Sequence, residues 1–541
     1  MVILNTIVVM FFIGVLLFVP QIVDDIHMED TVLLGNIAWR GLNGYFPVID
    51  YPHFYGGITE LAITVAFYLF GTSYKSIDYG FILLFFFACL ATWTLCWKRL
   101  SYNYITLLTA LAAALLISLD PLEVVQVFHI GHSFSYNHLA VVLMLSLIVF
   151  ACSAHDESQR EFITAFLAGV ILYVLILIKT TFGLIGPSII FVCLLQRRWT
   201  SALLIMAGVT TAMLFLDPGM PRALGSLSFL LKSDAAAEAG GFWGALKVTL
   251  QMLRGQVVPI GVTLILAMTL WRRQRSNAVS LIVSIAVCGL GYGLCMLTTG
   301  GSPEKKLLPF VVVASSLLVS ALARADPQKR EVLKYLKLAT FTPVLFAYLL
   351  IVPAMASSLQ LVLHADKNKD ARLVEEGPLS DYVVIDPEDT NHKTRFMSVA
   401  SRLSDARLHS LDRVRTGALV ERDKYVMFAD GIEMLQGIPH ISGYGIISNG
   451  RMFDFTMPLK SKVVLSYPVW PTLSSVKRTR NSPLESDVDM VMISDEVPAL
   501  RLVTDPLRAR MGQDFQQCRR SAYWTLFARR TLPKDACDSS V

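Results

Sequence analysis

The chain has 541 residues, of which 54% are hydrophobic and only 16% are charged, and its net charge at pH 7 is +5. Soluble proteins carry about 25% charged residues, so this composition excludes an ordinary soluble protein, and the small net charge gives no sign of a nucleic-acid partner. Long apolar runs continue to residue 357, whereas residues 358–541 have the composition of a globular domain. We therefore expect a membrane domain over 1–357 and a second domain over 358–541.

Apolar stretches of the membrane domain predict about eleven transmembrane helices. They lie near residues 3–22, 78–97, 103–119, 138–152, 162–178, 182–196, 200–216, 256–271, 277–297, 306–323 and 336–357. Helices satisfy their own backbone hydrogen bonds inside a bilayer, so we predict a polytopic α-helical fold. The first run has no basic segment before it and no clear cleavage site, which favours a retained anchor over a signal peptide.

Basic residues between these spans gather in alternate loops. They are Lys98, Arg99, Arg160, Arg197, Arg198, Arg272, Arg273, Arg275 and several residues between Arg324 and Lys337. By the positive-inside rule these loops and the N-terminus are cytoplasmic, so the C-terminal domain is extracytoplasmic. A bacterial inner membrane with a periplasmic C-terminal domain fits this orientation. The apolar stretch 57–71 carries Glu60 and would reverse the order as a span, so we interpret it as a helix in the outer interface.

The first outer loop, residues 23–77, carries acidic residues directly after the first span. A helix is predicted from Asp30 to Arg40, and its face with Asp30, Leu33, Leu34 and Ile37 would rest on the membrane. Ionisable residues at a membrane boundary often serve a site, although each one could also be a solvated loop charge. The polar and aromatic candidates of this loop are Asp25, Glu29, Asp30, Asp50, His53 and Tyr55.

The second outer loop, residues 120–137, is rich in histidine. Its candidates for substrate contact are His129, His132 and Tyr136. Histidines near carboxylates could bind a metal, but the spacing is not HExxH and Gly131 argues against a rigid helical pair. Ordinary hydrogen bonding or substrate contact is the preferred interpretation of this loop.

Lysines also occur at the outer ends of predicted spans, against the positive-inside bias. Lys179 follows one span, and Lys305 and Lys306 precede another. The phosphate of a membrane lipid would give these cations a partner. The alternative is that they extend to lipid headgroups.

The layout resembles the GT-C superfamily of glycosyltransferases. Its members have an acidic motif after the first span, an interfacial helical region, a functional loop between the third and fourth spans, and in many cases an extracytoplasmic C-terminal domain. The matching residues of the first loop are Asp30, Ala38, Trp39, Gly44, Pro47, Asp50, His53 and Gly56. The run from Lys306 to Pro309 is similar to the start of a late span in the aminoarabinose-transferase branch.

This resemblance implies transfer of a sugar from a polyprenyl-phosphate donor to an acceptor hydroxyl on a glycan, lipid or protein. The Asp-Glu dipeptide of several branches is absent from the first outer loop, so Asp30 is our first candidate for the general base, with Glu29, Asp25 and Asp50 as rivals. Candidates for neutralising the departing phosphate are Lys179, Lys305, Lys306 and Arg40. A divalent metal, Mg or Mn, could assist, as it does in some branches.

The C-terminal domain is predicted to be α/β. Its strand-like runs are 382–385, 425–428, 463–465 and 489–493, and a helical stretch covers 395–404. Cys518 and Cys537 are the cysteines of this domain and could form a disulfide in an oxidising compartment.

Other classes of membrane protein compete with this interpretation. A transporter would place charges in the middle of its helices and often shows inverted repeats, and neither pattern is convincing here. A polysaccharide polymerase or O-antigen-ligase-like enzyme would have a large, arginine-bearing late loop, whereas the late loop 298–305 is short. A non-enzymatic sensor would not need the acidic first loop.

Overall fold

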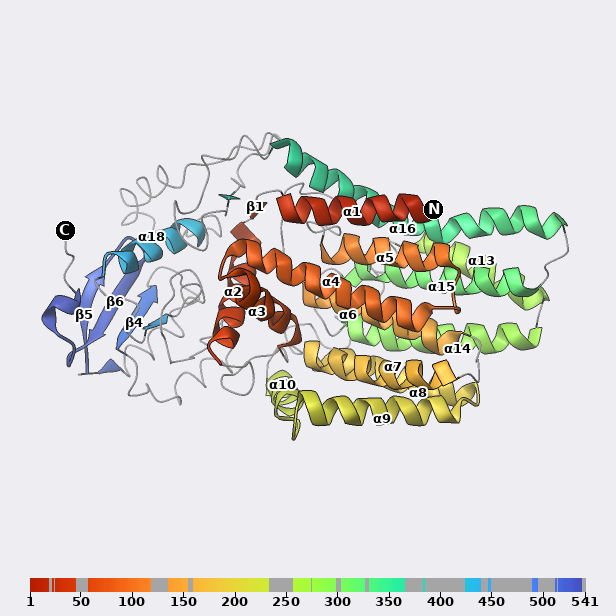
Figure 1. Cartoon of the computed structure of the whole chain (residues 1–541), viewed down its shortest axis with the longest axis horizontal. Coiled ribbons are helices and arrows are strands. Elements are labelled where there is room, and N and C mark those ends of the chain that lie inside the picture. The colour runs from red at the N-terminus through yellow and green to blue at the C-terminus, as the bar shows by residue number, and fades with distance from the viewer. Residues whose placement is uncertain are drawn as a thin grey trace.

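The computed structural model shows a bundle of long helices with the strands of the C-terminal domain at one end (Figure 1). We call this end the domain end of the bundle and the other the far end. The structure describes residues 1–18, 22–23, 25–44, 57–117, 135–153, 159–232, 256–273, 275–297, 303–325, 330–364, 383–384, 424–438, 446–448, 489–494, 511–512 and 514–537.

A helix is present at every predicted span. These helices are α1 (Val2–Phe18), α4 (Tyr74–Cys96), α5 (Tyr102–Leu116), α6 (Ser135–Cys152), α7 (Gln159–Ile178), α8 (Ile185–Leu195), α9 (Trp199–Leu216), α13 (Val257–Arg273), α14 (Arg275–Leu297), α15 (Pro303–Ala325) and α16 (Arg330–His364). Four helices in the described part are long and apolar enough to cross a membrane, namely 75–96, 160–178, 199–216 and 278–296. The chain is thus a helical membrane protein, and the total of about eleven crossings stays a prediction.

Large apolar side chains cover the outside of this bundle. Phe18, Tyr68 and Phe215 are each about four-fifths exposed, at 83%, 78% and 81%. Water would make this exposure unfavourable, but lipid tails are as apolar as the side chains themselves. The surface of the bundle therefore agrees with a lipid environment.

Two glycines allow α7 and α9 to pack at unusually short range. A Cβ atom on Gly169 would lie 2.0 Å from the carbonyl oxygen of Ile205, and one on Gly208 would lie 2.1 Å from that of Phe166. Because both obstacles are backbone atoms, no side-chain rotation could relieve the overlap. Small residues at a helix crossing let two backbones approach closely, as is common in membrane proteins.

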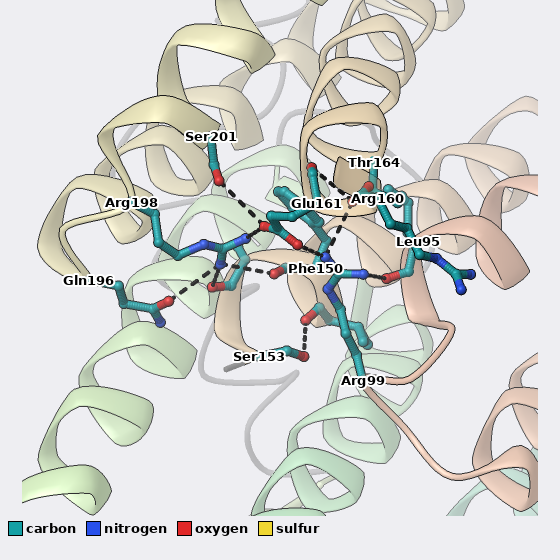
Figure 2. A network of polar contacts seen from close by, with 12 residues as sticks. Leu95, Arg99, Phe150, Ser153, Arg160, Glu161, Thr164, Gln196, Arg198 and Ser201 are labelled. Carbon is teal, nitrogen blue, oxygen red and sulfur yellow. Dashed lines mark hydrogen bonds and ion pairs between the residues drawn. The ribbon is translucent and has the colours of Figure 1, made fainter. Parts of the chain in front are cut away.

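A buried network of ion pairs around Glu161 links the helices at the far end of the bundle (Figure 2). The Glu161 carboxylate, 2% exposed, forms ion pairs with both Arg99 and Arg198. Arg198 also donates to the carbonyl oxygens of Phe150 and Ala151 at 3.2 and 3.1 Å. The network joins the ends of α4, α6 and α8 to the first turns of α7 and α9.

The network gives two of the basic residues a partner that we did not predict. Arg99 and Arg198, which we predicted to lie on the cytoplasmic side, both pair with Glu161, and each also lies over the Phe150 ring at 4.9 and 4.8 Å. A pattern of charges alone could not show this, because Glu161 is far from Arg99 in sequence. Arg160 is exposed and lies over Trp97 at 5.3 Å, outside the ion pairs.

Three further helices lie at the domain end of the bundle (Figure 1). They are α2 (Asp25–Leu42), α3 (Ile58–Phe70) and α10 (Pro221–Lys232). The helix predicted over residues 30–40 is confirmed within α2, and the stretch 57–71 does form a helix, α3. Our prediction that α2 rests its apolar face on the membrane is wrong for Leu34 and Ile37, which are 3% and 1% exposed and are therefore covered by protein.

The C-terminal region, which we predicted to be a separate domain and call the C-terminal domain, contains a four-stranded sheet in the order β3–β4–β6–β5. The strands are β3 (Ile446–Ser448), β4 (Met490–Ser494), β5 (Phe515–Arg520) and β6 (Trp524–Arg529); β3 pairs parallel with β4, and the other pairs are antiparallel. The strand predicted over 489–493 is confirmed as β4. The runs predicted over 463–465 and 395–404 lie outside the described residues.

The strand predicted over residues 425–428 is wrong, because this segment begins helix α18 (Lys424–Gln436). A short apolar run fits a strand or a helix equally well. The residues after it decide the matter, since Ile432 and Leu435 of the same helix are three residues apart and are both buried. That spacing places them on one face of a helix.

The C-terminal domain meets the first outer loop at two places. Strand β1 (Ile22–Val23) pairs parallel with β2 (Val383–Val384), with Ile22 opposite Val383, and α18 contacts α2. The run predicted as a strand over 382–385 is therefore confirmed in β2. These contacts hold the acidic helix α2 between the bundle and the C-terminal domain.

Cys518 and Cys537 form a disulfide, as their location in the C-terminal domain suggested. We expect Cys518→Ser to lower the free energy of unfolding of this domain by about 2 kcal/mol, because the bond closes a loop between residues 19 apart. Thermal unfolding with and without reductant measures this effect. Reductant should lower the melting temperature of the wild type and leave Cys518→Ser unchanged; equal stability of the two proteins would contradict the expectation.

Candidate functional site

Helices α2 and α3 pack directly on one another at the domain end of the bundle. The Thr64 hydroxyl of α3 donates a hydrogen bond to the carbonyl oxygen of Ala38 in α2 at 3.1 Å. A Cβ atom on Gly41 would lie 2.7 Å from Thr64 Oγ1, so a glycine is needed for this approach. The helix of the predicted catalytic acids and the helix of Glu60 are therefore in contact.

The predicted acids lie within α2 and not in a loop before it. Helix α2 begins at Asp25, five residues earlier than the sequence predicted, so Asp25, Glu29 and Asp30 all belong to its first turns. Acidic residues are favourable at this end of a helix, since they face the positive pole of its dipole. Their side chains, and the residues Asp50, His53 and Tyr55, lie outside the described part of the chain.

Lys179 is buried at the domain end of α7. It directly follows the last helical residue, its backbone is extended, and the residue is only 7% exposed. Protein therefore covers Lys179, whereas a lysine that extends to headgroups would keep its ammonium group at the surface. The structure thus disfavours the headgroup interpretation for this residue.

Two threonines follow Lys179 in the short helix η2 (Thr180–Leu184), which leads into α8. The hydroxyl oxygens of Thr180 and Thr181 are buried and have no hydrogen-bond partner among the described residues. Buried polar atoms usually have a partner in the protein, in water or in a ligand. Lys179 and the two threonines follow one another in the chain, and an ammonium group and hydroxyl groups are the types of donor that suit a phosphate.

Glu60 is a buried carboxyl that we did not predict as a site residue. It lies in the first turn of α3 and is 2% exposed, and its Oε2 atom has no hydrogen-bond partner in the described part of the chain. Burial raises the pKa of this carboxyl to about 7, and a smaller contribution from its own backbone N–H lowers it. The signal in the sequence was an acidic residue in an otherwise apolar helix.

The start of α3 lies beside the domain end of α7. Ile58 of α3 packs against a cluster that includes Tyr173 and Leu177 of α7. Glu60 lies two residues after Ile58, and Lys179 lies two residues after Leu177. Both ionisable residues therefore occupy the same corner of the bundle.

Asp217 fixes helix α10 over this corner. Its carboxylate accepts hydrogen bonds from the backbone N–H groups of Arg222 and Ala223 at 3.0 and 2.9 Å, and from the Tyr173 hydroxyl at 3.0 Å. It therefore caps the N-terminus of α10. These three donors explain why a carboxylate is buried at this position, so Asp217 needs no role in chemistry.

The remaining candidates are placed only in part. Tyr136 lies in the first turn of α6 and is 7% exposed, whereas His129 and His132 lie outside the described residues. Arg40 lies in the last turn of α2, half-buried. Lys305 and Lys306 lie in the first turn of α15, but their side chains are not among those described.

The described residues contain no group of three or more His, Cys, Asp or Glu side chains that could hold a metal ion. The acidic side chains of α2 are not among the described residues, so they are not covered by this search. The expectation of Mg or Mn therefore stays a prediction.

Neither a family model nor a curated protein matches the chain. Among solved structures, the chain is similar to ArnT from Cupriavidus metallidurans bound to undecaprenyl phosphate, with 11% identity, a TM-score of 0.43 and 97% of each chain covered. It is also similar to the oligosaccharyltransferase of Archaeoglobus fulgidus in complex with Zn and sulfate, with 14% identity and a TM-score of 0.39, over 91% of this chain and 67% of that one.

Proposed function

We propose that the chain is a membrane glycosyltransferase that moves a sugar from a polyprenyl-phosphate donor to an acceptor hydroxyl. One observation carries this proposal. At a single end of an apolar bundle, the acidic helix α2 packs on α3, and α3 packs on the end of α7 where Lys179 is buried. Carboxylates and a buried cation at a membrane boundary match the two charges that develop during transfer from a phosphate.

The reaction breaks the bond between the anomeric carbon and the phosphate oxygen, and the phosphate leaves with the electron pair. The acceptor hydroxyl attacks from the opposite face and gives its proton to a carboxylate. We assign this base to Asp30, with Asp25, Glu29 and Asp50 as alternatives, because α2 brings the first three to one end of the bundle. Lys179 neutralises the phosphate, and Arg40, Lys305 and Lys306 are further cations for it.

The sugar and the acceptor would meet the polar and aromatic residues of the two outer loops. These are His53, Tyr55, His129, His132 and Tyr136. The donor's lipid tail would reach the site sideways from the bilayer, which explains why such an enzyme is built from apolar helices.

The proposed orientation places the domain end outside the cytoplasm, in a bacterium the periplasm. The basic loops at the far end support it. So does the disulfide of the C-terminal domain, because such bonds persist in oxidising compartments.

Transfer by the purified protein tests the proposal directly. We expect wild type in detergent to transfer label from one member of a panel of radiolabelled polyprenyl-phosphate sugars, with membrane extract as the acceptor. Asp30→Asn should lower the rate about 100-fold or more, the usual contribution of a general base. Glu433→Gln is the control, because Glu433 is an exposed carboxylate of α18 in the C-terminal domain.

A second variant tests the cation. We expect Lys179→Met to weaken binding of undecaprenyl phosphate and to slow transfer about 100-fold, since it removes a charge that faces the leaving group. Lys98→Met, a lysine at the far end of the bundle, should change neither quantity. Transfer that survives in Asp30→Asn would move the base to Asp25, Glu29 or Asp50. If wild type consumes no donor at all, the enzyme proposal is wrong and a transporter becomes the better interpretation.

A further inference from the structure

The hairpin of β5 and β6 bears a cavity of about 360 Å³ that the proposed reaction does not use. Its lining includes Phe515, Gln517 and Arg520 of β5, and Thr525 and Phe527 of β6. Ligand pockets in proteins commonly have volumes of about 300 to 1,000 Å³ and contain a few polar groups that fix the ligand. We call this cavity the hairpin pocket.

The register of the two strands explains why these side chains meet. Gln517 is paired with Phe527, and Arg520 is paired with Thr525. Paired residues point to the same face of a sheet, and so do residues two apart on one strand, such as Thr525 and Phe527. All four side chains therefore lie on one face of the hairpin, which we call the pocket face.

A β-bulge brings Arg520 to the pocket face. The register shifts between Gln517 and Arg519, so Cys518 is the extra residue of β5. Without this residue, Arg520 and Gln517 would point to opposite faces, because they are three residues apart. Cys518 is held by its disulfide to Cys537, and the Arg519 Nε–H donates to the Cys537 carbonyl oxygen at 2.9 Å. The bulge is therefore fastened to the segment that follows β6.

The other face of the hairpin is closed by the core of the C-terminal domain. Leu526 of β6 lies in the same buried cluster as Ile432 and Leu435 of α18. On the pocket face, by contrast, Gln517 and Arg520 are exposed. Their amide and guanidinium groups are therefore accessible to a ligand.

The charge of the hairpin favours an anionic ligand. Residues 514–530 include four arginines and one acidic residue. They are Arg519, Arg520, Arg529 and Arg530, with Asp514 as the acidic residue. Arg529 lies over the Phe515 ring at 4.9 Å, so it adds a second guanidinium group to the pocket face. A guanidinium group can bind a carboxylate or a phosphate through two parallel hydrogen bonds.

The hairpin lies on the side of the C-terminal domain that is remote from the bundle (Figure 1). The hairpin pocket is therefore distinct from the corner where α3 meets the end of α7. This location does not suit a lipid headgroup at the bilayer surface, whereas a glycan outside the membrane can reach it.

We propose that the hairpin pocket binds an acidic sugar unit of a glycan. Arg520 binds the carboxylate or phosphate group of this unit, and the Gln517 amide binds its hydroxyl groups. A cation together with an amide and the Thr525 hydroxyl suits a ligand that carries both a negative charge and hydroxyl groups. The choice of a sugar among such ligands rests on the proposed glycosyl transfer, but the pocket takes no part in the chemical step.

Ligand-observed NMR on the full-length protein in detergent tests this site. Glucuronic acid and glucose 6-phosphate are the probes for a carboxylate and a phosphate, and we expect at least one to bind wild type, with glucose about tenfold weaker. Arg520→Gln should weaken binding about tenfold or more, because it removes a charged hydrogen-bond partner. Arg530→Gln removes an equal charge from an exposed arginine directly after β6, so it is the matched control and should bind as wild type does.

A second variant distinguishes a sugar site from a site for a simple anion. Gln517→Ala should weaken binding of the acidic sugar about fivefold and leave binding of inorganic phosphate unchanged, because it removes only a contact to hydroxyl groups. Both variants replace exposed side chains, so their melting temperatures should equal that of wild type. If inorganic phosphate binds as tightly as the acidic sugars, the assignment to a sugar is wrong.

The remaining outcomes separate the pocket from the proposed function. The pocket assignment is wrong if neither acidic sugar binds wild type, or if Arg520→Gln binds them as tightly as wild type does. Triglutamate that binds better than both sugars would overturn it in favour of an acidic peptide. None of these measurements depends on transfer: transfer without binding leaves the glycosyltransferase proposal standing, and binding without transfer leaves the pocket standing.

Discussion

We expect Glu161→Ala to lower the free energy of unfolding by about 3 to 5 kcal/mol, which is the usual cost of removing one partner from a buried ion pair. The loss is large because Arg99 and Arg198 would remain as two like charges at one buried place. Thermal unfolding of the detergent-solubilised protein measures the effect.

A matched arginine variant separates the network from a general effect of charge at the far end. Arg160→Ala removes an exposed cation that lies over Trp97 and outside the ion pairs, so we expect little change in stability. The double variant Glu161→Ala with Arg198→Leu should recover part of the loss, since it removes one of the two unpaired charges. A melting temperature for Glu161→Ala equal to that of Arg160→Ala would show that the network contributes nothing.

Gly169→Val is expected to cost about 3 kcal/mol or more, at the upper end of the cost of overpacking. The added Cβ atom would lie 2.0 Å from the Ile205 carbonyl oxygen, so α7 and α9 would have to separate along their crossing. Size-exclusion profiles and thermal unfolding of the purified variant measure the loss of folded protein.

The control for this experiment is a glycine in another helix, at a position where an added Cβ atom would meet no other atom. A Cβ atom on Gly14 of α1 would meet nothing within 4 Å, so Gly14→Ala should be neutral or slightly stabilising, because alanine favours a helix over glycine. Gly208→Ala should behave like Gly169→Val in direction, since its Cβ would meet the Phe166 carbonyl oxygen at 2.1 Å. Wild-type stability of Gly169→Val would contradict the close crossing of α7 and α9.

The positions of the long helices could be predicted from the sequence because an apolar run of membrane length has few alternatives. The same reasoning failed where the segment was short or its partners were distant. Residues 425–428 form a helix because Ile432 and Leu435 continue the pattern with helical spacing. The pairing of β5 with β6 was not predicted, since their alternation of polar and apolar residues is weak.

In the candidate site too, some features could be predicted from the sequence and others depend on the packing of the helices. The sequence located the acids and Lys179 through their types and their places in the loops, whereas burial decides what each can do. Lys179 could have reached lipid headgroups or lain inside the protein, and only the packing at the end of α7 distinguishes these. The sequence shows Glu60 only as an acidic residue in an apolar stretch, whereas its burial depends on how α3 packs against α2 and α7.

The pairing of β1 with β2 has a consequence for the biogenesis of the protein. Ile22 leaves the ribosome early, but its partner Val383 follows only after the whole membrane domain has been made. The backbone groups of β1 therefore cannot pair with β2 while the bundle is being inserted. The beginning of α2 is fixed only after β2 has been made. A chain truncated after residue 357 would insert its helices and still lack this final step, so such a fragment would retain the acids of α2 without the strand that holds the start of their helix in position.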